Sequence, residues 1–230
     1  MGANKGNSLE RLVAFSGIDG SGKTTLAKLL LESLRKNGMI VDYVWCRHES
    51  RNLSMLVRVM KRLTKDNADE GSNEMQYSDL KSRFLSRQIV KTVYKTFVFL
   101  DYLIEVNLRV KKRMKSVDFL IVDRYILDVA ADVISECRMG EAEANSYLQL
   151  LSRSMPPANV TLIVLVPLKV AFERKNDIVS EKYLSDRLEA YKRLRLSSAV
   201  HEIDGTFDIM KSLQDIQSIV NPLINGNGKD

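Results

Sequence analysis

A cluster of turn-forming residues close to the amino terminus constrains the fold more than any other part of the chain. Five of six consecutive positions in FSGIDGSGKTTL, residues 15–26, hold such residues: Gly17, Asp19, Gly20, Ser21 and Gly22. The apolar run Leu12–Phe15 precedes the cluster, and leucines spaced along one helical face follow it. Because glycine permits tight turns and the flanking runs have the patterns of a strand and a helix, the segment predicts a strand–loop–helix unit.

Short apolar runs alternate with longer helical stretches through the rest of the chain. Further strands are expected at residues 39–45, 119–122, 160–166 and, more weakly, 199–203. Helices are expected at residues 50–66, up to about 115, from about 125, over 168–199 and over 207–223. The second of these helices has an apolar stripe: Val93, Phe97, Leu100, Ile104 and Leu108. The alternation indicates βαβ units, and so a three-layer α/β/α fold with helices on both faces of a mostly parallel five-stranded sheet.

The composition is that of an ordinary globular domain. Of the 230 residues, 45% are hydrophobic and 28% are charged, and no apolar run approaches the roughly 18 residues that a membrane span needs. We expect one domain over residues 1–230, with a helical substrate-side region at about 50–115 and a frayed tail at 224–230. Cys46 and Cys137 lie far apart in the sequence and are expected to be reduced thiols of a cytoplasmic protein rather than metal ligands.

The net charge of +6 is compatible with nucleic acid, an anionic membrane or small phosphorylated ligands as partners. Basic residues are spread along the chain, and the cluster at 109–115 lacks the interleaved aromatic residues of single-strand binding. We therefore expect no nucleic acid and no membrane among the partners.

The glycine cluster fits the P-loop pattern G-x-x-x-x-G-K-[ST] over Gly17–Thr24. Its turns let consecutive backbone N–H groups point at phosphate oxygens, and the helix N-terminus adds partial positive charge. Lys23 is expected to reach the β- and γ-phosphates of ATP, and the Thr24 hydroxyl to ligate Mg²⁺. The predicted nucleotide-binding residues are Gly17, Asp19, Gly20, Ser21, Gly22, Lys23, Thr24 and Thr25.

Charged residues follow the other strands, at the edge where an open α/β sheet binds ligands. Asp123 comes directly after the apolar run 119–122 and is expected to hold Mg²⁺, while Arg124 suits a second phosphate group. Arg47 follows the second strand and could grip the same acceptor phosphate. Plainer alternatives are a helix cap at Asp123 and a surface position for Arg47.

A basic segment after the fourth strand, at about 172–182, is expected to act as a lid over the triphosphate. Its cations are Arg174, Lys175 and Lys182. The alternative for this segment is a solvated helix with i,i+4 ion pairs.

The order of these motifs resembles the thymidylate kinase family. The shared features are FSGIDGSGKTT, Arg47, Asp123-Arg124-Tyr125, the basic segment, EKYLSDRLEAYKRL at 181–194 and the late strand with HEID. They span about residues 10–222. The resemblance implies a P-loop NTPase-type fold, ATP and Mg²⁺ as cofactors, and phosphoryl transfer from ATP to a nucleoside monophosphate, normally dTMP, in nucleotide biosynthesis.

The resemblance also implies roles for individual residues. Asp19 would contact the acceptor sugar or support the active site, and Arg47 and Arg124 would bind the acceptor phosphate. Lys23 would bind the transferring phosphoryl group, and Thr24 with Asp123 would manage Mg²⁺.

Some family members carry a basic residue inside the loop, where this chain has Gly20 and Ser21. The compensating catalytic cation would then come from the lid, with Arg174 preferred to Lys175. Because the family is commonly homodimeric through helices, a homodimer is also implied.

The family reads thymine with a Phe-x-x-x-Arg stretch on the helix before Asp-Arg-Tyr, and this chain departs from that pattern. The matching region is TFVFLDYLIE, in which Phe99 is followed by Leu103, or Val98 by Tyr102, at the required spacing. Neither register supplies the arginine. Phe99 and Tyr102 are nevertheless the predicted acceptor contacts, and Arg83 or Arg87 could substitute; otherwise the acceptor is not dTMP.

Three functions follow as hypotheses from these residues. The first is a nucleoside monophosphate kinase, with dTMP as the principal acceptor and another nucleotide as the alternative. The second is a P-loop ATP-binding regulator without phosphoryl transfer. The third is a nucleic-acid-directed ATPase, which would bind polynucleotides with a steep salt dependence.

Overall fold

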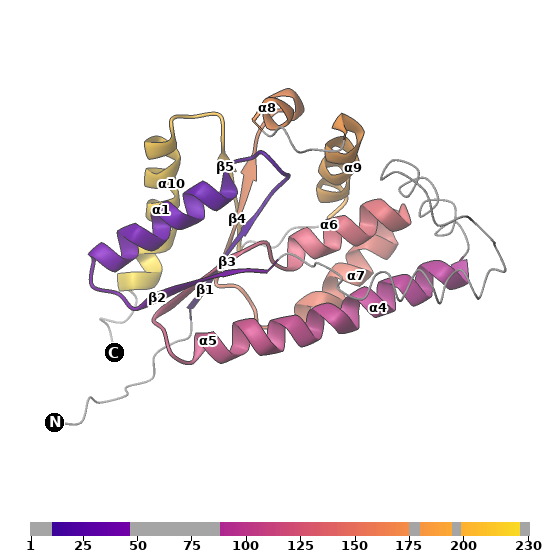
Figure 1. The fold of residues 1–230 in the computed structure, drawn as a ribbon, viewed down its shortest axis with the longest axis horizontal. Coiled ribbons are helices and arrows are strands. Elements are labelled where there is room, and N and C mark those ends of the chain that lie inside the picture. The colour runs from indigo at the N-terminus through magenta and orange to yellow at the C-terminus, as the bar shows by residue number, and fades with distance from the viewer. Residues whose placement is uncertain (1–10, 47–87, 175–179, 195–198, 226–230) are drawn as a thin grey trace, which may run out of the picture.

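A five-stranded parallel sheet forms the centre of the protein (Figure 1). The computed structural model describes residues 11–46, 88–174, 180–194 and 199–225. The strands are β1 (Arg11–Ser16), β2 (Val41–Trp45), β3 (Phe119–Asp123), β4 (Val160–Leu165) and β5 (Val200–Asp204). Their order is β2-β3-β1-β4-β5, with every neighbouring pair parallel. The predicted strands and the α/β fold class are confirmed.

Helices cover both faces of the sheet, as the alternating pattern predicted. The helices α1 (Lys23–Lys36) and α10 (Ile209–Asn225) pack on one face, against Val13, Phe15 and Ile121 among others. The opposite face is covered by a larger group, and Figure 1 shows the two layers on either side of the sheet. That group contains α4 (Gln88–Val106), α6 (Ile126–Cys137), α7 (Glu141–Ser154) and α9 (Glu181–Lys192).

The central strand β1 sets the position of the glycine loop. All six of its residues are buried, because helices and neighbouring strands surround it on every side. Phe15 lies level with Asp123 of β3 in the register, so the loop that follows β1 leaves the sheet beside the acid that ends β3. The short helix α8 (Leu168–Glu173), which follows β4, reaches the same edge.

Most of the apolar stripe that the sequence analysis identified is exposed along α4 and the turn that follows it, although Phe97 packs against the core. Leu100, Ile104 and Leu108 are 51%, 59% and 68% exposed. A neighbouring stripe is buried instead: Val90, Tyr94, Val98, Tyr102, Val106, Val110 and Met114. Both faces are apolar, so periodicity alone could not decide which one packs on the core.

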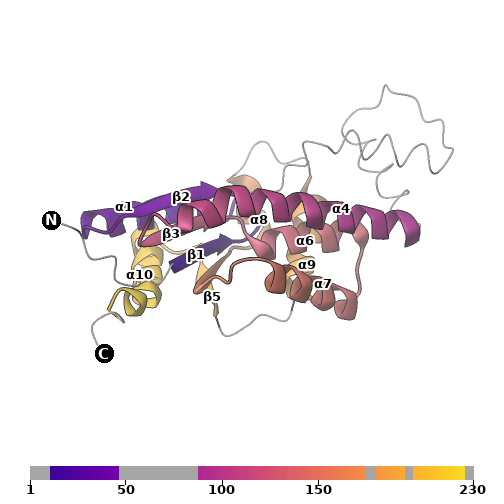
Figure 2. The same cartoon turned by 90° about the horizontal axis from the view of Figure 1, so that it is seen from below.

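A π-helical turn helps the buried stripe to stay on one side. It covers Asn107–Lys111 and is followed by the short α5 (Lys112–Met114), so the helix continues toward β3. Positions four residues apart drift by about 40° around an α-helix of 3.6 residues per turn. The wider π turn reverses part of that drift. In Figure 2, α4 extends past the sheet next to α6. Within the described ranges, no helix has the length and apolar character to cross a membrane.

Candidate active site

The glycine loop between β1 and α1 has the backbone that its sequence predicts. Gly17, Gly20 and Gly22 have φ angles of 140°, 81° and 90°, which side-chain-bearing residues rarely adopt. At Gly20 there is also no room for a side chain, because a Cβ would lie 2.1 Å from the carbonyl oxygen of Ala171 in α8. The loop thus turns tightly against α8 and leads directly into the N-terminus of α1. The first turn of α1 has no acidic residue, so no side chain there opposes the binding of an anion at the loop.

A cavity of about 360 Å³ lies over this loop. It collects residues from four separate parts of the chain: Asp19, Gly20, Gly22, Lys23, Thr24, Thr25, Trp45, Arg124 and Arg174. The structure therefore brings the P-loop, Arg124 and Arg174 to one place. The half-exposed ring of Trp45 was not predicted, although its position at the end of β2 gives the signal that could have found it.

Lys23 is buried at the floor of this arrangement. Its Nζ donates a hydrogen bond of 3.0 Å to the carbonyl of Ile18. Burial, together with the charge of the neighbouring Arg124, lowers the pKa of Lys23 from 10.5 to about 8, against the opposing charges of Asp128, Asp19 and Asp123. A phosphate group placed beside this ammonium would favour its charged form.

Asp123 ends β3 beside the first turn of α1. Its Oδ2 accepts hydrogen bonds from the Thr24 hydroxyl, at 2.6 Å, and from the Tyr43 hydroxyl, at 2.8 Å. Its Oδ1 is buried and has no hydrogen-bond partner within the described part of the chain. A carboxylate oxygen and a hydroxyl are the ligands that Mg²⁺ prefers, so Thr24 and Asp123 fit the predicted metal pair. Sequence reasoning missed Tyr43.

Arg124 is a buried cation held between two carboxylates. Its Nη2 forms an ion pair with Asp19, and its Nη1 lies 3.4 Å from Oδ1 of Asp128. Burial favours a lower pKa for Arg124, but Asp128 and Asp19 outweigh it and hold the pKa above its ordinary value. The backbone φ of 67° is also unusual for a non-glycine residue. The guanidinium group is therefore fixed in charge and direction at the edge of the cavity.

Asp128 was not among the predicted site residues. It lies in the first turn of α6, where one of its carboxylate oxygens accepts from the backbone N–H of Tyr125 at 3.3 Å. Burial raises the pKa of Asp128, and Arg124 and Lys23 oppose that shift. The capping pattern of an acid near a helix start was visible in the sequence, but its contact with Arg124 depends on the fold.

The helix α9 reaches the glycine loop through Tyr191. The hydroxyl of Tyr191 accepts a hydrogen bond of 3.3 Å from the backbone N–H of Gly17 and interacts with Asp128. One turn earlier in α9, Arg187 donates to Asp132 of α6 at 2.6 Å and stacks on the ring of Tyr183. This buried pair fixes α9 on α6 and so holds Tyr191 at the loop.

The remaining predicted residues have mixed positions. Arg174 lines the cavity and donates from Nη1 to the carbonyl of Gly205 at 3.0 Å. Lys182 is exposed and pairs with Asp186 four residues on, which is the solvated arrangement given above as the alternative. Four other basic residues that the sequence analysis named as candidates lie outside the described residues: Arg47, Arg83, Arg87 and Lys175.

The predicted acceptor contacts on α4 do not line the cavity. Tyr102 is fully buried beneath the end of β2, where its hydroxyl interacts with the Cys46 thiol. Phe99 is half-buried and packs against the core on the same side of the sheet. The structure thus does not bring either of them to the residues of the glycine loop.

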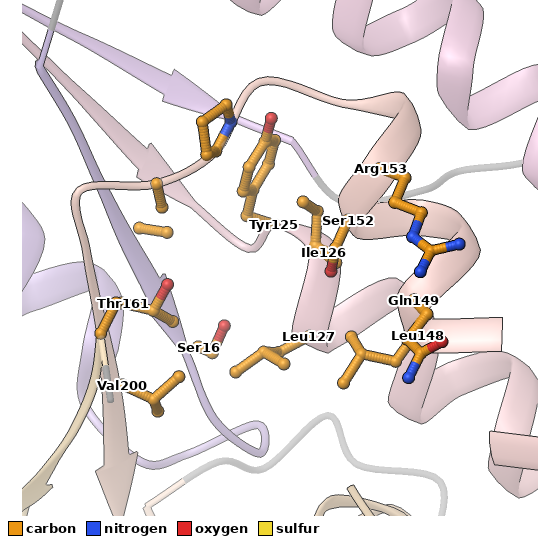
Figure 3. A pocket seen from close by; sticks show the side chains of 14 residues that line it. Ser16, Tyr125, Ile126, Leu127, Leu148, Gln149, Ser152, Arg153, Thr161 and Val200 are labelled. Carbon is orange, nitrogen blue, oxygen red and sulfur yellow. The ribbon is translucent and has the colours of Figure 1, made fainter. Parts of the chain in front are cut away.

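A second cavity of about 360 Å³ lies on the face of the sheet that α6 and α7 cover, between these helices and the strands. Figure 3 shows Ser16, Thr161 and Val200 on its strand side, with Gln149 and Arg153 across from them on α7. Tyr125 closes one end and donates its hydroxyl proton to the Pro156 carbonyl at 2.9 Å. It shares no lining residue with the cavity over the loop.

The fold and the site together define a class. A glycine loop between the first parallel strand and its helix, with Lys23, Thr24 and the acid ending a neighbouring strand, is the arrangement of P-loop nucleotide-binding α/β proteins. Residues 3–123 match the family described as "Nephrocystin 3, N-terminal". That match covers more than half of the 230 residues, so the chain belongs to this family.

Two curated relatives align along almost the whole chain. A probable thymidylate kinase of Metallosphaera sedula is 29% identical over 223 residues, covering 91% of this chain and 93% of the relative. A probable thymidylate kinase 1 of Saccharolobus solfataricus is 23% identical over 221 residues, covering 92% and 97%. The similarity therefore extends well beyond the P-loop, through the strands and helices that follow it.

Proposed function

We propose that the protein is a Mg²⁺-dependent nucleoside monophosphate kinase that transfers the γ-phosphoryl group of ATP to an acceptor nucleotide, with dTMP as the first candidate. The observation that carries the proposal is one cavity lined both by the P-loop and by the buried Arg124. The P-loop, its lysine and the Mg²⁺ ligands already supply the groups that bind a triphosphate, so a further fixed cation beside them suits a second phosphate group. The names of the two relatives support the same activity.

The donor half of the site is the P-loop. Its backbone N–H groups and the N-terminus of α1 would bind the phosphates, and Lys23 would neutralise charge on the transferring group. Thr24 and Asp123 would hold Mg²⁺, which would neutralise charge on the phosphate groups. Arg174, at the far side of the cavity, is the candidate for the additional cation.

The acceptor half is built around Arg124. Because Asp19 and Asp128 each use one terminal nitrogen, the guanidinium keeps further N–H donors for an acceptor phosphate. An oxygen of that phosphate would attack Pγ in line; the new O–Pγ bond forms as the bond from Pγ to the bridging oxygen breaks, and ADP leaves. The protein contributes positioning and charge, because this transfer needs no covalent intermediate with the protein.

The identity of the acceptor base is the finer part of the proposal. Neither register of the stretch before Asp123 supplies the thymine-reading arginine, and Tyr102 and Phe99 do not line the cavity. A kinase of the same fold with another acceptor is thus the second candidate. A non-catalytic ATP-binding regulator is the third, but it leaves the buried, charge-paired Arg124 without a role.

A product assay tests these alternatives directly. The protein is incubated with ATP, Mg²⁺ and each common ribo- and deoxynucleoside monophosphate, and the nucleotides are separated by chromatography. ADP and the matching diphosphate should appear together, and Lys23→Ala should abolish both. Lys192→Ala, an exposed lysine with its own ion pair, is the control and should be fully active. ADP formation without any diphosphate would refute the kinase proposal.

We also propose a homodimer that pairs through the exposed face of α4. Val93, Leu100, Ile104 and Leu108 form an apolar stripe in which three of the four residues are more than half exposed. A stripe along one straight element is suited to a two-fold interface, because two copies bury the same surface. Multi-angle light scattering gives the mass, and a monomer at micromolar concentration would contradict the proposal.

A further inference from the structure

Tyr43 lies where the sheet meets the candidate metal pair. It is the middle residue of β2, the edge strand next to β3, and it packs against the core on the α1 side of the sheet. Its hydroxyl reaches Oδ2 of Asp123 at 2.8 Å. The ring therefore runs from the sheet to the acid that ends the neighbouring strand.

The two oxygens of Asp123 have different surroundings. Oδ2 accepts from both Thr24 and Tyr43, whereas Oδ1 is buried and has no hydrogen-bond partner in the part of the chain that the structure describes. A buried carboxylate oxygen is costly to leave unpaired. The arrangement fixes one oxygen with protein donors and leaves the other for a cation or a water molecule bound to it.

We propose that Tyr43 is a positioning residue for the divalent cation. Its hydroxyl would hold the Asp123 carboxylate in the orientation that offers Oδ1 to the metal bound with the nucleotide. The inference rests on the proposed function, because it assigns a residue to the metal side of the same site. Groups that orient metal ligands from behind typically change metal affinity or activity by 10–100-fold when they are removed.

The chemistry of Tyr43 suits this role better than that of Thr24. The Thr24 hydroxyl oxygen would itself ligate the metal, so its geometry has to satisfy both the cation and Asp123. Tyr43 is anchored in the sheet and has the carboxylate as its hydroxyl partner.

The test uses Tyr43→Phe, which removes the hydroxyl and keeps the ring. Mn²⁺ is the probe, and its binding to the protein in the presence of a non-hydrolysable ATP analogue is measured by electron paramagnetic resonance. We expect the Kd for Mn²⁺ to rise about tenfold or more, while metal-free binding of the analogue stays within about twofold. In steady-state assays, the Mg²⁺ concentration for half-maximal rate should rise, and saturating Mg²⁺ should restore most of kcat.

Tyr147→Phe is the matched control. The Tyr147 hydroxyl donates to the carbonyl of Lys95 at 3.3 Å, away from the cavity over the loop, and its removal should leave Mn²⁺ binding unchanged. A folded Tyr43→Phe protein with wild-type Mn²⁺ affinity overturns the inference and leaves the kinase proposal intact. Wild-type protein that binds no Mn²⁺ with the analogue overturns both.

Discussion

Nucleotide binding should be coupled to the uptake of a proton by Lys23. The pKa of this side chain is about 8 in the protein, because burial and Arg124 disfavour its charge. A bound triphosphate adds several negative charges next to the ammonium and should return the pKa to about 10 or above. At pH 8, Lys23 is about half protonated before binding and fully protonated afterwards. The protein should therefore take up about half a proton from solution for each nucleotide that binds.

The same linkage sets the size of the effect on affinity. With a pKa of about 8, the charged fraction of Lys23 is about nine-tenths at pH 7 and about one-tenth at pH 9. Affinity for the Mg²⁺ complex of a non-hydrolysable ATP analogue should therefore fall about tenfold between these pH values, or about 1.4 kcal/mol. Calorimetry in buffers of different ionisation enthalpy measures the proton uptake, and the titration itself gives the Kd.

Two variants isolate the contribution of Lys23. Lys23→Arg stays charged over the whole range, and Lys23→Gln is never charged, so neither should take up the additional proton. If wild-type protein binds the analogue at pH 8 without net proton uptake, or if both variants take up as much as the wild type, the argument that burial discharges Lys23 is refuted.

Four further predictions concern stability and assembly. Lys23→Met should raise the free energy of unfolding by up to about 3 kcal/mol at pH 7 in urea titrations; the gain should shrink as pH rises from about 8 to 10.5, because the wild-type lysine then loses its charge in the folded protein. Gly20→Ala should destabilise the fold by more than Gly38→Ala in thermal unfolding, since both have φ near 80° but only Gly20 would clash with Ala171. Asp132→Asn should cost about 2–3 kcal/mol in chemical denaturation by removing the carboxylate that pairs with the buried Arg187, whereas the exposed Asp186→Asn should change stability by about 0.5 kcal/mol or less. Ile104→Glu should yield a monomer in light scattering while Glu189→Lys, on an exposed face of α9, should not.

Local pattern was sufficient for most of the fold. Buried parallel strands have short, continuous apolar runs, and all five such runs became strands within about two residues of the predicted limits. The helix α4 shows where this reasoning stops. Its two faces are both apolar, and the choice between Leu100 and Tyr102 as the buried side depends on contacts with α6 and β2 that no periodicity contains.

The candidate site divides in the same way. Lys23, Thr24 and Asp123 could be predicted because the loop motif and the strand end fix their positions relative to one another. Tyr43 and Asp128 could not, since each is ordinary in its own element. Tyr43 is one residue in the alternating pattern of an edge strand, and Asp128 is an acid in the first turn of a helix. The order of the strands brings Tyr43 to Asp123, and the packing of α6 on the sheet brings Asp128 to Arg124.

Tyr43 and Asp128, which the sequence did not predict, help the site to hold several charged groups close together. Lys23 and Arg124 repel each other, which lowers the pKa of Lys23, and Asp19 and Asp128 counter that repulsion from the side of Arg124. Asp123 is shielded by two hydroxyl donors rather than by a cation. The carboxylates thus partly neutralise Arg124, hydroxyls orient Asp123, and the ammonium of Lys23 donates to the Ile18 carbonyl rather than to a carboxylate in the described part of the chain. A triphosphate with Mg²⁺ supplies an anion for Lys23 and a cation for Asp123 at once, which is why the affinity of each should depend on the presence of the other.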